Sequence, residues 1–366
     1  MSTLIEIKEL KKYFPVGKTG IFGKHKSILK AVDNVSFEIK KGENLGLVGE
    51  SGSGKTTLGR TIIHLIEPTG GEVLFDTGKE KIDVAKLRRN ELRYQWRNMQ
   101  MIFQDPYASL NQRMTVKDII GEPLIANKLA SGDELNEKIK NIAVLCGLKP
   151  SQLRRYPHAF SGGQRQRIAI ARALVMHPEF IVCDEPVSAL DVSIQAQILN
   201  LLKDLRKELD LTYLFVAHDL SAVAYASDRV AVMYLGRIIE MAVTEELYYA
   251  PKHPYTEALM SSIPPDDPDV SMQKLHMVGE QPSPVNPPSG CPFHPRCKYA
   301  DDSRCVKELP ELREVFPGHL LSCHYAESLS LKGALQFQIK ERETSGKKQV
   351  EYLNKNREKI LTKSKK

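Results

Sequence analysis

The chain has 366 residues, enough for a full α/β core and a second, smaller unit. Polar or charged residues interrupt every apolar run before the ~20 residues that a membrane-spanning helix needs, and Glu6 and Lys8 interrupt any signal peptide. The net charge of +7 lies almost entirely in residues 340–366, where ten Lys and Arg accompany four Glu. We therefore expect a cytosolic protein with no bilayer span and no basic groove for nucleic acid. The basic tail at 331–366 is expected to be solvated and mobile. The alternatives for this tail are an arm that binds nucleic acid and a contact with anionic lipid headgroups.

The first predicted elements are antiparallel strands. Residues 4–14 and 31–43 alternate apolar and polar side chains and are rich in β-branched types, as strands with one wet face are. Residues 43–49 form a short apolar strand that runs into a glycine loop, and residues 55–67 follow as a helix. This order of strand, glycine loop and helix is typical of a phosphate-binding unit.

The glycine loop GESGSGKT matches the pattern G-x-x-x-x-G-K-[ST] and has the right flanks, although a glycine-rich turn can match by chance. Its glycines let backbone N–H groups approach phosphates, Lys55 can reach the β- and γ-phosphates, and Thr56 can bind Mg²⁺. We therefore predict that a nucleotide is bound here. The predicted contacts in this loop are Gly49, Ser51, Gly52, Ser53, Gly54, Lys55, Thr56 and Thr57.

The rest of the core is predicted to be a parallel sheet. Residues 121–156 are polar and helical in composition, and apolar strands follow at 180–185 and 213–219 with a helical pattern between them. Strand, helix and strand in this order favour right-handed crossovers. Residues 228–241 then indicate a hairpin that turns near Gly236, and the prolines beyond it mark an extended region.

Polar residues at strand ends are candidates for catalysis. Asp184 and Glu185 end the strand at 180–185, and α/β sheets bind ligands at such strand ends. Adjacent residues of a strand point to opposite faces, so these two can serve one site only if the chain turns there. Asp184 would then bind Mg²⁺ and Glu185 would orient or activate the attacking water; two solvent-facing loop acids are the alternative. His218 could meet the γ-phosphate or be structural, and Gln104 could sense the metal or the water, or cap a loop.

A second helix start, FSGGQ at residues 160–164, also exposes backbone N–H groups. Ser161 and Gln164 match a capping box, which would explain the helix start without any ligand. A capping box does not require Gly162 and Gly163, which each cost ~1 kcal/mol relative to alanine inside a helix. We therefore expect a group to approach this backbone closely, and infer a nucleotide held by another chain.

In this order, GESGSGKTT, FQD, FSGGQRQR, FIVCDEPVSALD and VAHD resemble the nucleotide-binding domain of ATP-binding cassette (ABC) ATPases over residues 1–262. The resemblance implies an α/β fold with an antiparallel β subdomain and a helical subdomain at about 105–175. It implies that two such domains pair head to tail, so that residues 161–164 cover the partner's ATP and Asp191 contacts the partner. Phe14 matches the aromatic residue that stacks on adenine, with Tyr13 as the second candidate.

The same resemblance assigns the chemistry of the site. Glu185, His218 and Gln104 are its implied catalytic residues, and Thr56, Gln104 and Asp184 are its implied Mg²⁺ ligands. ATP and Mg²⁺ are the implied cofactors. A module that binds ATP without hydrolysing it would not need Glu185 and His218, which are both present.

A narrower set of motifs, including LKKYFPV, FQDPYASLNQRMTV, HPYTEAL and NPPSGCPFHPRC, is similar to the ATPase subunits of bacterial oligopeptide and dipeptide (and related nickel) importers, specifically the second of their two paired ATPases. The resemblance implies an ATPase that powers solute import at the cytoplasmic face of the membrane. Its implied partners are a second, homologous ATPase, two permease subunits and an extracytoplasmic substrate-binding protein, with no nucleic acid. A soluble ABC ATPase acting on nucleic acid or ribosomes is the alternative, but such proteins typically carry two cassettes or long coiled coils.

Residues 263–330 are rich in proline, and we predict that they form a small C-terminal extension. Four of the six cysteines lie in this region, within a span of 33 residues. In a reducing compartment this clustering favours a metal site over disulfides, whereas Cys146 and Cys183 indicate core positions. Importers of this family carry a four-cysteine segment here, reported in some as a [4Fe–4S] site; zinc is the alternative, with His294, His319 or His324 as substitute ligands. The predicted thiolate ligands are Cys291, Cys297, Cys305 and Cys323.

Overall fold

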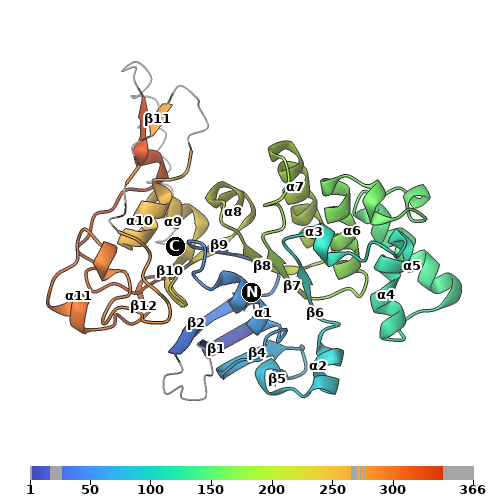
Figure 1. Ribbon diagram of the computed structural model, residues 1–366, viewed down its shortest axis with the longest axis horizontal. Helices are drawn as coiled ribbons and strands as arrows, with labels where there is room; N and C mark the ends of the chain where they lie inside the picture. Colours follow the sequence, from blue (N-terminus) through green and yellow to red (C-terminus); the bar gives the residue numbers. More distant parts are fainter. Residues whose placement is uncertain are drawn as a thin grey trace, which may run out of the picture.

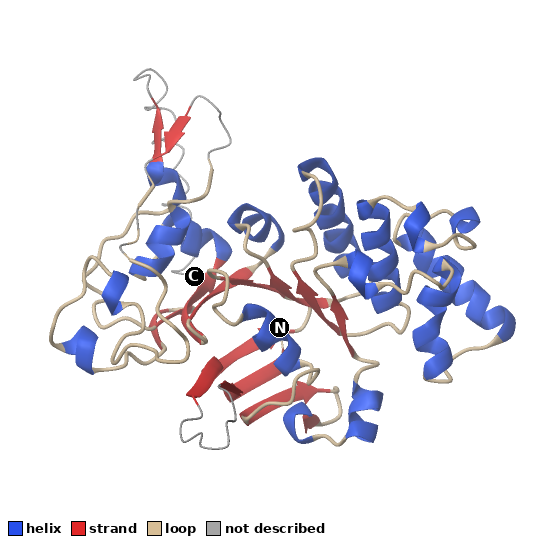
Figure 2. Cartoon of the chain, in the orientation of Figure 1, coloured by secondary structure: helices blue, strands red, loops and turns tan. Residues whose placement is uncertain are grey.

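The computed structural model describes residues 2–16, 27–264, 270–272, 274–275, 277 and 279–340. A large sheet forms its centre, with a smaller sheet below it and helices above it and at one end (Figure 1). Figure 2 shows the same division between strands and helices. The predicted basic tail lies outside the described residues from residue 341 onward.

The smaller sheet is antiparallel, in the order β2-β1-β4-β5. β1 and β2 pair along their whole length, from Thr3 opposite Lys40 to Val16 opposite Ser27, which confirms the two predicted strands. Their apolar residues alternate with polar ones, so one face packs on the core and the other meets water. The strands of this sheet are β1 (Thr3–Val16), β2 (Ser27–Lys40), β4 (Gly70–Asp76) and β5 (Lys81–Asp83).

The larger sheet has the order β12-β13-β10-β9-β3-β8-β7-β6. Its strands β9, β3, β8, β7 and β6 are parallel, as predicted, and β9 and β10 form the predicted hairpin about Gly236. β3, β7 and β8 are buried throughout because both faces of a parallel sheet are covered. Its strands are β3 (Asn44–Val48), β6 (Met99–Ile102), β7 (Phe180–Asp184), β8 (Thr212–Val216), β9 (Arg229–Tyr234), β10 (Arg237–Val243), β12 (Arg313–Phe316) and β13 (His319–Leu321); β11 (Val270–Met272) and β14 (Gln338–Lys340) pair separately.

The helices cover the larger sheet and extend one end of the molecule. α3, α4, α5 and α6 follow one another in the range predicted to be helical, and α4 and α5 pack against α6. The α-helices are α1 (Lys55–Ile62), α2 (Arg89–Gln95), α3 (Pro106–Ser109), α4 (Val116–Ala126), α5 (Gly132–Leu145), α6 (Gly162–Leu174), α7 (Val192–Glu208), α8 (Leu220–Ala226), α9 (Thr244–Tyr249), α10 (Pro254–Met260) and α11 (Arg304–Lys307). The 3-10 helices are η1 (Val84–Lys86), η2 (Pro150–Gln152), η3 (Pro157–Ala159), η4 (His294–Arg296) and η5 (Ala334–Phe337). In the described part of the chain, none of the helices has the length and apolar character needed to span a bilayer.

Two apolar cores, one on each face of the larger sheet, hold its parallel strands in position. One lies between the two sheets and contains Leu45 and Leu47 of β3 together with Leu58 of α1. The other lies on the helical side of the larger sheet and contains Val48 of β3 and Phe215 of β8. Both predicted core cysteines, Cys146 and Cys183, are buried in this second core. α1 is therefore fixed between the sheets directly after the strand that leads into the glycine loop.

The C-terminal extension adds the hairpin β12–β13 to the edge of the larger sheet at β10. Its His319 is fully buried, with Nε2 2.8 Å from Glu240 Oε1 and Nδ1 3.1 Å from Glu246 Oε1. Burial would lower the pKa of His319, but these two carboxylates raise it to about 9. His319 therefore carries a positive charge at neutral pH and binds the hairpin to β10 and α9, and both of its ring nitrogens are taken. His319 is therefore not free to act as a substitute ligand of the predicted metal site, which was one of the alternatives.

Candidate functional site

The glycine loop, residues 49–54, fits between β2 and β9 with no space for side chains at two positions. A Cβ on Gly54 would lie 2.1 Å from the carbonyl oxygen of Ala31, and one on Gly49 would lie 2.2 Å from that of Met233. Gly54 also has φ +107°, which residues with a side chain rarely adopt. The two glycines let the loop lie against the sheet and leave the start of α1 without a side-chain cap. The N–H groups of its first turn can therefore face an anion.

The loop also holds a buried ammonium and a buried hydroxyl. Lys55 Nζ donates to the carbonyl oxygens of Gly49 and Glu50, at 2.8 and 2.9 Å. Burial lowers the pKa of Lys55, and nearby carboxylates, Glu185 first, oppose that effect. Ser53 Oγ is buried and has no hydrogen-bond partner among the described residues. These groups fit a phosphate, whose oxygens would accept from the ammonium, the hydroxyl and the backbone N–H groups.

The predicted magnesium ligands Thr56 and Asp184 are in direct contact. Thr56 Oγ1 donates to Asp184 Oδ1 at 2.8 Å, and Arg60 Nη2 lies 3.4 Å from Asp184 Oδ2. Asp184 is fully buried at the end of β7; burial raises its pKa, while Thr56 and Arg60 oppose this. A hydroxyl and a buried carboxylate side by side are the oxygen ligands that suit Mg²⁺ beside a nucleotide.

The chain turns sharply at Glu185, which has φ +48°. Such a conformation costs ~1–3 kcal/mol in a residue other than glycine and is typical of functional sites. Because the chain turns here, the adjacent residues Asp184 and Glu185 can face the same site, as their predicted roles require. Gln104 Nε2 donates to Glu185 Oε2 at 2.9 Å, and His218 Nδ1 lies 3.1 Å from the same oxygen. The three predicted catalytic residues therefore meet around one carboxylate oxygen.

Gln104 was also expected to bind Mg²⁺. Its side-chain amide contacts Glu185, and no hydrogen bond of the described residues joins it to Thr56 or Asp184. In this structure Gln104 orients Glu185, and its role as a metal ligand stays a prediction.

The comparisons with known proteins agree with this geometry. Residues 32–188 match the family model of the ABC transporters, and residues 239–305 match that of the oligopeptide/dipeptide transporter C-terminal region. The oligopeptide transport ATP-binding protein AppF of Bacillus subtilis (strain 168) is 51% identical over 325 residues, which cover 88% of this chain and 97% of AppF. The chain belongs to the ATP-binding proteins of oligopeptide-type ABC transporters. As a member of this family it is an ATPase that uses ATP with Mg²⁺.

Solved structures agree on the fold. The dimeric, post-hydrolysis structure of the ATP-binding cassette MJ0796 bound to ADP and Pi is 30% identical, covers 66% of this chain and 99% of its own, and has a TM-score of 0.58. CbiO1 from Clostridium perfringens, part of the ABC transporter complex cbiONQ, is 27% identical, covers 68% of this chain and 91% of its own, and has a TM-score of 0.57. The ABC ATPase fold predicted from the motifs is thereby confirmed.

The second helix start forms a capping box. Ser161 Oγ accepts from the Gln164 N–H at 3.4 Å, and Gln164 Oε1 accepts from the Ser161 N–H at 3.2 Å. The predicted close approach occurs at Gly163, but from within the chain, since a Cβ there would lie 2.4 Å from Ile194 Cγ2 of α7. Packing on α7 thus explains Gly163 without a ligand, so this glycine does not indicate a nucleotide held by another chain.

The exposed part of this helix start remains available to a partner. Ser161 and Gly162 are exposed, and so is Asp191 at the start of α7. Val192, next to Asp191, is 81% exposed, which is unusual for an apolar side chain of this size. In the described chain, no hydrogen bond joins residues 161–164 to the glycine loop.

The two candidates for an adenine contact differ in their surroundings. The Tyr13 hydroxyl donates to Asp33 Oδ1 at 2.5 Å, in a network with Arg237. Phe14 is half-buried, and Lys12 Nζ lies 4.9 Å from the centre of its ring. Adjacent strand residues point to opposite faces, so only one of the two can face a base, and Phe14 has no polar group to satisfy. Phe14 therefore remains the better candidate.

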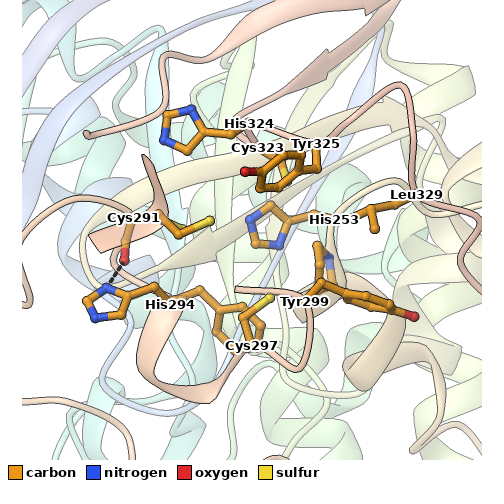
Figure 3. A pocket seen from close by; sticks show the side chains of 12 residues that line it. His253, Cys291, His294, Cys297, Tyr299, Cys323, His324, Tyr325 and Leu329 are labelled. Atoms are coloured by element: carbon orange, nitrogen blue, oxygen red, sulfur yellow. Dashed lines mark hydrogen bonds between the residues drawn. The ribbon is translucent and has the colours of Figure 1, made fainter. Parts of the chain in front are cut away.

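The four clustered cysteines line one small cavity of about 20 Å³. Figure 3 shows Cys291 and Cys297 with their sulfur atoms directed towards the same space. All four are free thiols, and His253, His294 and His324 also border the cavity. Within the described ranges, no group of three or more Cys, His, Asp or Glu side chains is arranged so that it could hold a metal ion. The convergence is as predicted, but the metal is not supported by this arrangement.

Two residues of the ATP site were not found by sequence reasoning. Arg60 lies four residues after Thr56, on the same face of α1, and this spacing could have identified it as a partner of Asp184. Tyr255 accepts the N–H of Glu50 with its hydroxyl at 2.8 Å, although 205 residues separate the two. No local pattern in the sequence indicates that second contact.

Replacing Glu185 with Gln should leave the shape of the site intact but remove the carboxylate that can polarise water or accept its proton. We expect the assembled complex to bind ATP normally and its ATP turnover to fall at least about tenfold, measured as phosphate release. Glu179→Gln, at an exposed carboxylate that pairs with Lys41, is the matched control and should hydrolyse at the wild-type rate. Near-normal hydrolysis by Glu185→Gln would assign the role to another residue.

Proposed function

We propose that the chain hydrolyses ATP to power the import of peptides through separate permease subunits. The observation that carries this is the meeting of Lys55, Thr56, Asp184 and Glu185 at one edge of the parallel sheet, in a chain whose C-terminal region matches oligopeptide/dipeptide transporters. An ATPase that acts on nucleic acid or ribosomes would not need that C-terminal region. The 51% identity to AppF over nearly its whole length supports the peptide assignment.

The catalytic unit is a pair of cassettes. Ser161, Gly162 and Asp191 are exposed and have no hydrogen bond to the chain's own phosphate loop among the described residues, so they are available to a nucleotide or a loop of a second ATPase. The cassette of MJ0796, which has the same fold, was solved as a dimer. The partner is a homologous ATPase, and the sequence motifs favour a different chain over a second copy. His218 senses the γ-phosphate through the oxygen of Glu185 that it contacts.

The complex works at the cytoplasmic face of the membrane. The segment from Gln104 to Val116 contacts the permease subunits, and an extracytoplasmic protein delivers the peptide to them. Tyr107 in this segment is 56% exposed, which gives a permease helix an aromatic surface to pack on.

The C-terminal cysteines hold a [4Fe–4S] cluster, with zinc as the alternative. Backbone N–H groups of Phe293, Tyr299, Ala300 and Tyr325 donate to three of the sulfurs, a pattern that stabilises metal-bound thiolates; those sulfurs belong to Cys291, Cys297 and Cys323. Burial raises the pKa of Cys291 to about 12 and that of Cys323 to about 11, so a metal that binds here would have to displace their protons. The arrangement of the described side chains favours neither metal, so the choice of the cluster rests on the family resemblance and on four-thiolate ligation.

Peptide import can be measured directly in vesicles that contain the assembled importer. With ATP on the side of the ATPase subunits, a labelled oligopeptide should accumulate, and Lys55→Ala should reduce uptake at least about tenfold because it removes the phosphate-binding ammonium. Lys138→Ala, which removes only a surface pair with Glu134, is the control and should import normally. ATP-dependent uptake of another solute class, with no uptake of peptides, would contradict the proposal.

The metal proposal has its own test. Protein purified without oxygen should be brown, with absorbance near ~400 nm and about four irons per chain, and Cys297→Ser should abolish the colour. Cys146→Ala, at a buried cysteine of the core, should leave the colour unchanged. A colourless protein with one zinc per chain would reject the cluster but keep a metal at the site, and a stable metal-free protein would reject both.

A further inference from the structure

The side chain of Arg296 joins the cysteine segment to the phosphate loop. This residue ends the 3-10 helix η4 and directly precedes Cys297. Its Nη1 and Nη2 donate to Oε2 and Oε1 of Glu50 at 2.8 and 3.0 Å, so the guanidinium binds the carboxylate with both ends of its fork. Glu50 is the second residue of GESGSGKT, and the Arg296 side chain is only 7% exposed.

Every polar group of Glu50 is held. Its N–H donates to the hydroxyl of Tyr255, its carbonyl oxygen accepts from Lys55 Nζ, and its carboxylate binds Arg296. A shift of Arg296 would therefore move Glu50, whose carbonyl oxygen also holds the ammonium of Lys55. Because the largely buried guanidinium binds both carboxylate oxygens, the contact restrains the loop.

An aromatic cluster connects this contact to the cysteine cavity. Tyr234, Tyr255 and Phe293 pack with ring centroids 4.7 to 5.4 Å apart, and Arg296 Nη1 lies 3.4 Å from the Tyr234 hydroxyl. Phe293 borders the cavity that Cys291 and Cys297 line. The backbone N–H of Cys297 bonds to the His294 carbonyl, so the cysteine and the arginine move with the same short helix.

Charge gives the contact a direct effect on nucleotide binding. Glu50 places a carboxylate inside a loop that binds a triphosphate, and an unpaired carboxylate there would repel the ligand. The guanidinium of Arg296 neutralises it. Its position thus affects both the shape of the loop and the charge that a nucleotide meets.

We propose that Arg296 is a positioning residue that links the four-cysteine segment to the phosphate loop, so that nucleotide binding and the conformation of residues 289–300 change together. The inference rests on nucleotide binding at the phosphate loop and is independent of which metal, if any, the cysteines hold. Linkage of this kind is reciprocal, so it can be measured from either side.

The first measurement is the affinity of the purified full-length chain for a fluorescent ATP analogue with Mg²⁺. Arg296→Met should raise the Kd about fivefold or more, within the usual range of coupling between sites. The double variant Glu50→Gln/Arg296→Met removes both charges and should bind better than Arg296→Met alone. Arg313→Met, which removes only an exposed pair with Glu327 in the same extension, is the control and should bind like the wild type.

The second measurement separates linkage from a merely structural role. Hydrogen–deuterium exchange of residues 289–300 is followed with and without a saturating, non-hydrolysable ATP analogue and Mg²⁺. In the wild type the nucleotide should slow exchange at least about fivefold, the same coupling that the affinity measurement is expected to show. In Arg296→Met at saturation the nucleotide should have no effect, and Arg296→Lys, which keeps the charge but loses the two-pronged contact, should give an intermediate one.

An equal nucleotide effect in the wild type and in Arg296→Met would reject Arg296 as the link. A wild-type chain that binds the analogue but shows no change in residues 289–300 would reject the coupling altogether. Failure of the wild type to bind the analogue would contradict the proposed ATPase function, which keeps the two proposals distinguishable.

Discussion

The contact of the phosphate loop with the sheet determines the rest of the ATP site. Gly49 and Gly54 lie so close to carbonyl oxygens of β9 and β2 that no side chain fits at either position. This contact fixes the start of α1, and with it Lys55 and Thr56, at the carboxyl end of β3. Because β3, β8 and β7 are parallel neighbours, Thr56 then meets Asp184 at the end of β7, and His218 meets Glu185. A shifted loop would separate Lys55 and Thr56 from Asp184 and Glu185.

The C-terminal extension is part of this arrangement. Its hairpin continues the larger sheet and is held there by His319, whose charge lies between two carboxylates of the nucleotide-binding domain. Its cysteine segment reaches the phosphate loop through Arg296 and Glu50. The division of the chain near residue 262 stays a prediction, since the hydrogen bonds of the sheet continue across that position. Residues 239–305, which include Arg296, match the C-terminal region of oligopeptide/dipeptide transporters.

The sequence predicts the elements that local patterns define. Strand periodicity, the glycine loop and the acids at the end of β7 each depend on a few neighbouring residues, so the parallel sheet and the groups around Glu185 could be predicted. Tertiary contacts could not: Gly163 is explained by Ile194 of α7, and the partner of Glu50 lies 246 residues away. The cysteines could be placed together because they cluster in the sequence, whereas the metal depends on the spacing of their sulfurs in three dimensions, which no sequence pattern gives.

The central claim is that each cassette completes the ATP site of its partner, and Ser161→Arg tests it most directly. Ser161 is exposed and lies at the start of α6, so an arginine there should leave ATP binding to the isolated chain unchanged, as photo-crosslinking of ATP measures. It should block ATP-dependent closure of the paired ATPases, because the large side chain occupies the surface that covers the partner's nucleotide. Equal loss of ATP binding by the isolated chain would contradict the account, since Ser161 would then serve the nucleotide of its own phosphate loop.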